Sequence, residues 1–367
     1  MKNNQTQRQR SGRCPTHRSH RVPGTNHRPI LPDRRILVGD ALAELRRLPT
    51  DSIDTVVTSP PYFLLRNYGV AGQLGAGASV EHWIAELRAV LTEVGRVLKP
   101  EGTLWLNLGD TYSRTPRHGA PAKSLLLGPE RLLVGLLADG WRVRNKVVWA
   151  KTSAMPSSVG DRLSSRWEPL YLLTRSHRYF FDLDAIREPA RSRARPSQGT
   201  GGQFQSEAKK PDWAGPGAGS NSGLAKMRAQ GLTSHPLGKN PGDVWSLATA
   251  GYRSAHFATF PEGLVERPLL ATCPERVCRR CGRAWRRANA SRRLGSLAVR
   301  GELRKSCPCP SRSWQPGLVL DPFMGAGTVG VVAQKLHRRW LGIELNPDFA
   351  RLAEERIQRT VATGGSR

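Results

Sequence analysis

Short apolar runs alternate with segments of helical spacing along most of this chain. Ile53 to Val57 is a mostly apolar run bounded by turn residues, as is typical of a buried strand. Residues 80–98 instead place apolar side chains at helical intervals, and Pro100-Glu101-Gly102 is expected to separate that helix from a strand at 103–108. The same criteria predict further strands at 35–40, 141–149, 318–320 and 340–343, and further helices at 41–48, 125–138, 262–270 and 329–336.

Two prolines follow the first of these strands, in Thr58-Ser59-Pro60-Pro61-Tyr62. Proline cannot donate to a sheet ladder, so the strand ends there and Ser59 and Tyr62 lie on a rigid turn. In open α/β sheets, the carboxyl ends of the strands are where ligands bind. The Ser59 hydroxyl and the Pro60 carbonyl can accept both hydrogens of an exocyclic amine, and Tyr62 can stack on a flipped base. For this segment alone, an ordinary Pro-Pro turn is an equal alternative.

A second turn connects the strand at 318–320 to the helix at 329–336. It reads Asp321-Pro322-Phe323-Met324-Gly325-Ala326-Gly327-Thr328, and its glycines let a ligand approach the backbone closely. No Lys follows the glycines, which excludes a phosphate-binding P-loop. The next strand ends in Glu344-Leu345-Asn346-Pro347, with Glu344 19 positions after Gly325. An acidic residue at about this distance binds ribose hydroxyls in nucleotide-type folds.

Taken together, the two turns resemble the motifs of the S-adenosylmethionine-dependent amino-group DNA methyltransferases. The Ser59 turn precedes the glycine turn, as in their circularly permuted β-group, and the resemblance covers residues 35–190 and 240–367. It implies an α/β, Rossmann-like class I methyltransferase fold with a mostly parallel central sheet, in which the two motif strands are central neighbours. It also implies further cofactor contacts, at Asp40 (which equally suits a helix N-cap), His256, Phe257 and Asn346.

The resemblance also implies the reaction. A methyl group passes from S-adenosylmethionine to an exocyclic amine of a base flipped out of duplex DNA. In this family, Ser before Pro-Pro-Tyr favours cytosine N4 and Asp or Asn favours adenine N6, so N4 is expected and N6 is the alternative. An RNA or protein amide methyltransferase can share the turn, but the permuted order favours DNA. A cytosine C5 enzyme would use a Pro-Cys nucleophile, and Pro308-Cys309 does not follow a predicted catalytic strand.

Positive charge is concentrated outside the predicted catalytic core. The chain has a formal charge of +28, of which residues 1–35 carry +8, residues 191–240 carry +6 and residues 274–314 carry +10. Basic segments attached to a nearly neutral core favour a polyanionic partner, here double-stranded DNA. Solvated tails or an Arg-rich coding bias would give the same composition. Lys151 and Arg162 are either contacts to the target backbone or solvated charges.

The cysteines predict a separate basic insertion. It holds Cys273, Cys278-Arg-Arg-Cys281 and Cys307-Pro-Cys309, which are five of the six cysteines. Two close pairs suit a tetrahedral zinc site with four thiolate ligands, although the second pair lacks the usual two-residue gap. Cys273 is a substitute ligand, and an insertion without metal is the alternative. A DNA-binding zinc protein without catalytic activity would explain the charge and the cysteines, but not the two turns.

Composition completes the predicted organisation. No apolar run is long enough for a membrane span and the N-terminus lacks an apolar signal core, so we expect a cytoplasmic protein without a membrane partner. A cognate restriction endonuclease is a candidate partner. The predicted segments are a disordered basic arm (1–34), a catalytic half (35–190), a flexible basic Gly/Ser-rich target-recognition segment (191–240), a cofactor-region segment and helix (241–272), the Cys-rich insertion (273–314) and a cofactor-binding half (315–367).

Overall fold

The computed structural model of the chain describes residues 33–65, 72–75, 77, 79–189, 235–250, 259–288, 292–294 and 297–364. The predicted basic arm and the target-recognition segment therefore lie almost entirely outside the described residues. His256 and Phe257 lie outside them as well. Among the described residues, none of the helices combines the length and the apolar character that a bilayer span requires.

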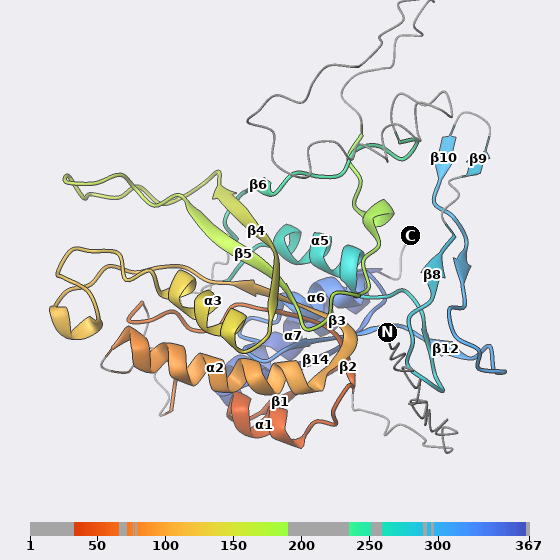
Figure 1. Ribbon diagram of the computed structural model, residues 1–367, viewed down its shortest axis with the longest axis horizontal. Coiled ribbons are helices and arrows are strands. Elements are labelled where there is room, and N and C mark those ends of the chain that lie inside the picture. Colours follow the sequence, from red (N-terminus) through yellow and green to blue (C-terminus); the bar gives the residue numbers. More distant parts are fainter. Residues whose placement is uncertain are drawn as a thin grey trace, which may run out of the picture.

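Eight strands form a single sheet at the centre of the molecule (Figure 1). All run parallel except β5, which is antiparallel to both of its neighbours. The α/β class and the mostly parallel sheet are thus confirmed. In spatial order the strands are β1 (Arg35–Val38), β14 (Arg339–Glu344), β13 (Leu318–Asp321), β2 (Ile53–Thr58), β3 (Leu98–Asn107), β5 (Trp167–Thr174), β4 (Arg142–Lys151) and β6 (Val244–Leu247).

The strand that precedes the Ser59 turn and the strand that precedes the glycine turn are adjacent at the centre of this sheet. β2 pairs with β13 through Val319 with Thr55 and Leu320 with Val56. β2 nevertheless comes more than 250 residues earlier in the chain. This inversion confirms the circularly permuted arrangement. The two halves of the chain build one sheet, because the first strand, β1, pairs with the last, β14.

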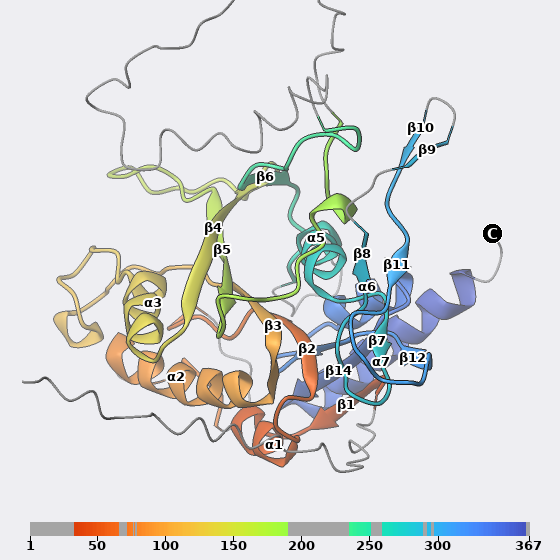
Figure 2. The same cartoon turned by 45° about the vertical axis from the view of Figure 1, so that its right-hand side comes forward.

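Helices cover both faces of the sheet and create two separate apolar cores (Figure 2). One core packs α1, α2 and α3 against the sheet, and the other packs α5, α6 and α7 against the opposite face. The bounds are α1 (Ala41–Arg47), α2 (Val80–Val97), α3 (Gly128–Ala138), α5 (Glu262–Thr272), α6 (Thr328–Lys335) and α7 (Pro347–Gly364), with 3-10 turns η1 (Pro116–His118) and η2 (Leu183–Ala185).

The start of β3 differs from the sequence-based expectation. We expected Pro100-Glu101-Gly102 to separate helix from strand, but β3 begins at Leu98, directly after α2. Leu98 pairs with Ile53 and Thr103 pairs with Thr55, so the residues between form an irregularity in the ladder. A Cβ on Gly102 would lie 3.1 Å from the Asp54 carbonyl oxygen. The Pro-Gly segment therefore forms a bulge inside the strand, and does not separate the helix from the strand.

The Cys-rich insertion leaves the sheet after α5 and returns directly before β13 (Figure 1, right). Its two ends are joined by a hydrogen bond from the Gly317 N–H to the Pro274 carbonyl (3.0 Å). The insertion contains three short antiparallel pairs of strands. They are β7 (Val277–Cys278) with β12 (Trp314–Gln315), β8 (Arg286–Arg287) with β11 (Leu303–Arg304), and β9 (Arg292–Leu294) with β10 (Leu297–Val299).

Candidate active site

A pocket lies at the carboxyl edge of the sheet, where the turns after β1, β2, β13 and β14 meet. Parallel strands bring their carboxyl ends to one edge, so these turns converge although they lie far apart in sequence. The predicted site residues in its wall are Asp40, Ser59, Pro61, Pro322, Phe323, Gly325 and Glu344. The remaining wall is made of Gly39, Ala41, Gly72, Gln73, Leu74, Ala326, Ile343, Leu345 and Phe349.

Glu344 closes the pocket at the end of β14. One carboxylate oxygen accepts the Gly325 N–H (2.8 Å) and the other accepts the Asn346 N–H (3.0 Å). Burial raises the pKa of this carboxyl group, and the two backbone hydrogen bonds partly oppose that effect. A carboxylate oxygen accepts more than one hydrogen bond, so both oxygens keep capacity for a hydroxyl donor in the pocket.

Asp40 lies at the end of β1, on the same pocket. Its Oδ1 accepts the Ala43 N–H (2.8 Å), which makes it the N-cap of α1. Capping satisfies one of the free N–H groups at the start of the helix. Since Asp40 also lines the pocket, capping and a contact to a bound molecule are compatible.

Asp321 does not line the pocket and is buried beside the neighbouring strand β2. Its Oδ1 accepts the Thr58 hydroxyl (2.7 Å) and the Phe323 N–H (3.0 Å), and the side chain is 1% exposed. Burial raises the pKa of Asp321 to about 7, against the effect of both hydrogen bonds, and the charge of Glu344 adds to the increase. The carboxyl group therefore ties β13 to β2 and shapes the turn.

Three other predicted cofactor residues do not line the pocket. Gly327 has φ +75°, and a Cβ there would lie 3.0 Å from the Ala353 Cβ, so α7 packs closely on the turn. The Thr328 hydroxyl accepts a hydrogen bond from Arg356 (3.1 Å). The Asn346 side chain accepts the Asp348 N–H (2.9 Å) at the start of α7. Gly327 and Thr328 thus hold the glycine turn against α7, and Asn346 caps the start of that helix.

Contacts with the protein core hold the Ser59 turn rigidly. The Trp83 Nε1–H donates to the Pro61 carbonyl (2.9 Å), and Trp83 is itself buried in the core. Pro60 is buried beneath the turn. A Cβ on Gly109 would lie 2.4 Å from the Tyr62 ring, so the ring rests on the Gly109 backbone. These contacts leave Ser59 exposed to the pocket on a turn that cannot move freely.

A polar network extends from Ser59 along the carboxyl edge. The Tyr62 hydroxyl lies 3.3 Å from the Ser59 Oγ and donates to the Glu168 Oε2 (2.9 Å). Asn107, at the end of β3, lies beside both groups, with its Oδ1 3.2 Å from the Tyr62 hydroxyl and its Nδ2 3.3 Å from the Glu168 Oε2. The Lys151 ammonium forms an ion pair with the Glu168 Oε1.

Sequence reasoning missed Glu168 and Asn107, and it left Lys151 open as a backbone contact or a solvated charge. Asn107 and Lys151 end parallel strands, whereas Glu168 lies at the start of antiparallel β5, so all three reach the same edge. A polar residue at a strand end was the available signal. The reversed direction of β5, which brings its beginning to the carboxyl edge, is not apparent from the residues of that strand.

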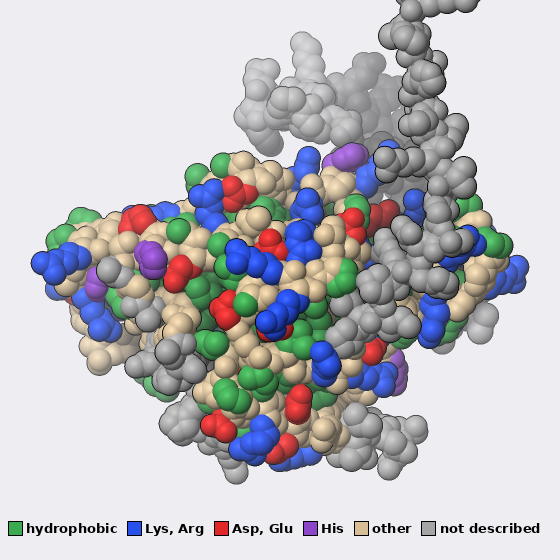
Figure 3. Space-filling view, turned by 90° about the horizontal axis from the view of Figure 1, so that it is seen from below, with side chains coloured by type: hydrophobic (Ala, Val, Ile, Leu, Met, Phe, Trp, Pro, Cys, Tyr) green, Lys and Arg blue, Asp and Glu red, His purple; other side chains and the backbone are tan. Residues whose placement is uncertain are grey.

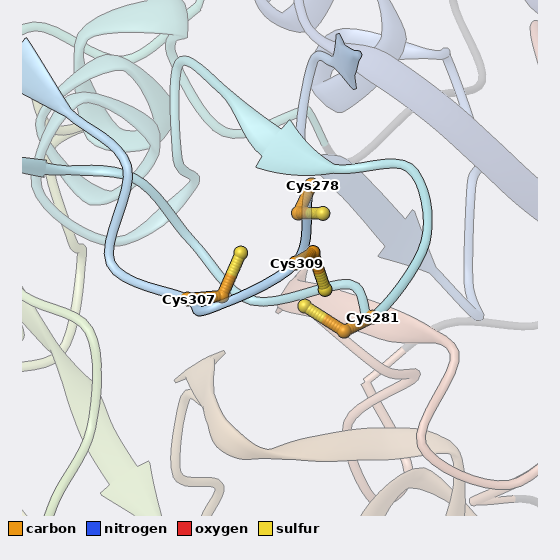
Figure 4. Close-up of side chains that lie close together, drawn as sticks. All are labelled: Cys278, Cys281, Cys307 and Cys309. Carbon is orange, nitrogen blue, oxygen red and sulfur yellow. The ribbon is translucent and has the colours of Figure 1, made fainter. Parts of the chain in front are cut away.

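The four cysteines of the two close pairs converge at the base of the insertion (Figure 4). The sulfur atoms of Cys278, Cys281, Cys307 and Cys309 all lie within 4.8 Å of one another. Burial would raise the pKa of the Cys278 thiol, but hydrogen bonds from neighbouring groups, including the Cys281 and Arg280 N–H groups, lower it to about 7. Thiolate is the form that binds metal, so this donor set fits a tetrahedral zinc ion.

Cys273, the suggested substitute ligand, does not join this cluster. It ends α5, is 1% exposed and packs in the apolar core with α6 and α7. Burial raises the pKa of its thiol to about 12. The interpretation of Cys273 as a ligand was therefore wrong, because the helix that precedes the insertion turns this side chain into the core.

Several known proteins are similar to this chain over most of its length. The family model described as DNA methylase matches residues 53–355. Type II methyltransferase M.XycI of Xanthomonas campestris pv. cyanopsidis is 34% identical over 90% of this chain and 89% of its own length. Type II methyltransferase M.Cfr9I of Citrobacter freundii is 32% identical over 87% of this chain and 86% of its own length. The solved PvuII DNA methyltransferase (cytosine-N4-specific) aligns over 89% of this chain and 90% of its own, with 19% identity and a TM-score of 0.48.

The family match extends across both turns, from β2 to α7, and so includes every strand of the central sheet except β1. The Ser59 turn comes first in the chain and the glycine turn second, on adjacent strands. The chain therefore belongs to the DNA methylase family, as an S-adenosylmethionine-dependent amino-group DNA methyltransferase of the permuted β-group.

Proposed function

We propose that this chain methylates the N4 amine of cytosine in duplex DNA. The observation that supports it best is that Ser59 and Glu344 face one pocket across the β2–β13 junction. The base and the cofactor then meet where the two central strands end. Ser59 carries a short neutral hydroxyl at the position where the adenine enzymes of this family have Asp or Asn, which favours cytosine.

The cofactor would lie between the β13 and β14 turns. Glu344 has free acceptor capacity for the two ribose hydroxyls, and Asp40 lies on the same pocket at the position expected for the adenine ring. Pro322, Phe323 and Gly325 line the same pocket as Ser59, on the turn after β13, the strand adjacent to β2. S-adenosylmethionine supplies an electrophilic methyl group on a sulfonium centre. Residues 251–258, which contain His256 and Phe257, lie outside the described residues.

The Ser59 turn would orient the amine. The lone pair of an exocyclic amine is delocalised into the ring. The nitrogen therefore attacks only if acceptors bind its two hydrogens and so direct the lone pair towards the methyl donor. The Ser59 Oγ and the Pro60 carbonyl are two acceptors on one rigid turn. As the new N–C bond forms and the S–C bond breaks, the methylated nitrogen becomes acidic and loses one proton to water, while the Ser59 Oγ and the Pro60 carbonyl accept hydrogen bonds from it. Positioning and exclusion of water account for the rate.

Lys151 and Glu168 would act through Tyr62. The ion pair fixes the Glu168 carboxylate, which accepts the Tyr62 hydroxyl, and that hydroxyl lies beside the Ser59 Oγ. Both charged side chains are less than one-fifth exposed. They are positioning residues, because neither borders the pocket in which the base and the cofactor would meet.

We also propose that the four-cysteine cluster holds a structural zinc ion. Four sulfur ligands about 2.3 Å from zinc stand roughly 3.8 Å apart in a tetrahedron, and the four Sγ atoms already lie within 4.8 Å of one another. The cluster lies beside the β7–β12 pair, away from the methyl-transfer pocket. Zinc would hold the basic insertion in place and take no part in the reaction.

Double-stranded DNA is the proposed partner. The segments with the highest positive charge, at 1–35, 191–240 and 274–314, would bind its backbone, and residues 191–240 would contribute to recognition of the target sequence. Several relatives are named Type II methyltransferases. On that likeness we infer a restriction endonuclease of the same target sequence as a partner in the cell.

The test is methyl transfer from labelled S-adenosylmethionine to unmethylated duplex DNA, followed by mass analysis of the nucleosides. N4-methylcytosine is the expected product. N6-methyladenine would contradict the proposed base and leave the fold unchanged. Unlabelled DNA, with the cofactor still bound, would contradict DNA as the substrate.

Ser59→Ala is the matched variant for the same assay. It removes one amine acceptor and leaves the cofactor wall intact, so we expect a rate about 100-fold lower with unchanged cofactor affinity. Full activity in this variant would contradict the proposed role of Ser59. Calorimetric titration with the cofactor, in the absence of DNA, measures the cofactor affinity independently of the rate.

A further inference from the structure

The loop between β4 and β5, residues 152–166, carries unusually exposed apolar side chains. Met155 is 89% exposed and Leu163 is 91% exposed, the highest values among the large hydrophobic residues that the structure describes. Isolated apolar residues are common on protein surfaces, but these two lie on one projecting loop. They contribute nothing to either apolar core.

This loop starts and ends at the polar network of the active site. It leaves β4 at Lys151 and enters β5 next to Glu168, and these two residues form the ion pair beside Tyr62. The Lys151 N–H donates to the Arg166 carbonyl (2.8 Å), which closes the base of the loop. Figures 1 and 2 both show the loop projecting from the ends of β4 and β5.

A cleft lies between the loop and the segment that follows the Ser59 turn. Its walls include Val159 and Arg162 of the loop, and Leu64 and Leu65, which follow the turn directly. The facing wall is the segment at 110–114. Because the loop also starts and ends at the ion pair that holds Tyr62, a double helix whose flipped base enters the Ser59 turn would pass close to this loop.

Cations flank the apolar side chains. The Arg162 guanidinium stacks 3.8 Å from the centre of the Tyr112 ring, and Lys123 pairs with Asp161 (2.9 Å). Arg114, which lines the cleft, and Arg166, at the base of the loop, are exposed. Figure 3, the view from below, shows Lys and Arg side chains spread among acidic and hydrophobic ones over that face of the molecule. This mixture suits DNA, whose phosphates attract the cations while its bases accept an apolar side chain.

We propose that Met155 and Leu163 insert into the DNA base stack beside the target base. This rests on the proposed function, because flipping a base out leaves a gap in the stack. Proteins that open DNA use Leu, Met and similar side chains as wedges, and each unstacked base step costs free energy. Insertion would bury two side chains that are otherwise almost fully in water, and this partly offsets that cost.

The test compares two duplexes that contain the site methylated by the wild-type enzyme. One is fully paired, and the other has a mismatch opposite the target base, which weakens its pairing. A Met155→Ser, Leu163→Ser double variant should lose about tenfold or more in kcat/KM on the paired duplex. On the mismatched duplex it should recover to within about threefold of the wild-type value, because that base is already loosely held.

Matched controls separate insertion from other effects. Val134→Ser removes another exposed apolar side chain, 68% exposed on α3, and should lower neither rate. Ser59→Ala should lower the rate on both duplexes, because it acts on the chemistry and not on opening. A 2-aminopurine at the target position measures opening in a second way, and its fluorescence increase on binding should be smaller with the double variant.

Two results would overturn the inference. One is an equal loss on both duplexes, which would mean that the loop contributes general DNA contact. The other is unchanged activity of the double variant on the paired duplex. Neither would affect the proposed function, provided that the wild-type enzyme methylates DNA. A wild-type enzyme that left all DNA unlabelled would overturn the proposed function, and the inference with it.

Discussion

At the scale of single residues, Asp321 couples stability to pH. Burial raises its pKa to about 7, well above the value of about 4 in an unfolded chain. Between those two values the folded state binds a proton that the unfolded state releases. The contribution of this group to stability is therefore full below about pH 4 and is lost as the pH rises through 7.

Asp321→Asn removes this titration and keeps an oxygen that can accept from Thr58 and Phe323. From pH 5 to pH 8, we expect the free energy of unfolding of the variant to rise relative to wild type by roughly 1–4 kcal/mol, because only the wild type has to ionise a buried acid. Urea denaturation at each pH measures the difference. If the free energies of unfolding of the two proteins changed with pH in parallel, the raised pKa of Asp321 would be contradicted.

Glu168 and Lys151 are tested through the Tyr62 hydroxyl that they hold. Glu168→Gln keeps a hydrogen-bond acceptor but leaves the mostly buried Lys151 without its anion, so the Tyr62 hydroxyl should lose its fixed position. We expect kcat to fall by roughly 10- to 100-fold, with the cofactor dissociation constant nearly unchanged. The thermal midpoint should fall as well, because Lys151 loses its partner in a mostly buried site. A purely structural pair would lower the thermal midpoint and leave kcat near its wild-type value.

Lys151→Met completes a double-mutant cycle. If the two residues act as one unit, the double variant should be no slower than the slower single variant. Losses in kcat that multiply would show that Lys151 and Glu168 act independently, and would contradict the proposed ion-pair role. Tyr62→Phe should give a loss similar to that of Glu168→Gln, because it removes the hydroxyl on which both residues act.

At the scale of elements, the close packing of α6 and α7 supports the glycine turn. Gly327 has positive φ, and its missing side chain leaves room for Ala353 and Ile357 of α7. The turn that lines the pocket is thus positioned by α7, which itself reaches the pocket only through Phe349 at its start. This explains why Gly327 belongs to the motif although it does not line the pocket.

Gly327→Ala should destabilise the fold by roughly 1–3 kcal/mol, and cofactor affinity should fall with it because the turn shifts. Thermal unfolding and cofactor titration measure the two effects. Gly263→Ala is the matched control, since Gly263 lies in α5 with ordinary φ and its nearest neighbour would be 3.4 Å away. An equally stable Gly327→Ala protein would contradict the packing argument.

At the scale of the whole molecule, the zinc proposal concerns how the insertion is joined to the sheet. β7 and β12 lie where the insertion begins and ends, and β12 leads directly into β13. A metal ion between the two cysteine pairs would therefore fix the insertion to the strand that carries the glycine turn.

Metal analysis of the purified protein should give one zinc ion per chain, and Cys281→Ser should reduce that value and expose the insertion to trypsin. Cys273→Ala is the control, because it removes a buried cysteine outside the cluster and should keep the zinc. Wild-type protein that contains no zinc and gains no stability when zinc is added would contradict the proposal.

Much of this architecture was predictable from the residues. The turn at Pro60-Pro61 and the turn at Gly325 follow from local stereochemistry, because proline lacks a donor and glycine accepts positive φ. The order of the two turns predicted the permuted fold, and β2 and β13 are indeed central neighbours. The two cysteine pairs predicted a cluster, which the fold closes across a long excursion.

The sequence by itself therefore determined the two turns, their order and the chemistry that they suggest, because each depends on residues close together in the chain. Only the tertiary structure decided which polar groups meet. Glu168 reaches Tyr62 because β5 runs antiparallel, and Asp321 faces Thr58 because β13 lies beside β2. Such pairings depend on strand order and direction, which arise from the packing of the whole chain and not from any local pattern.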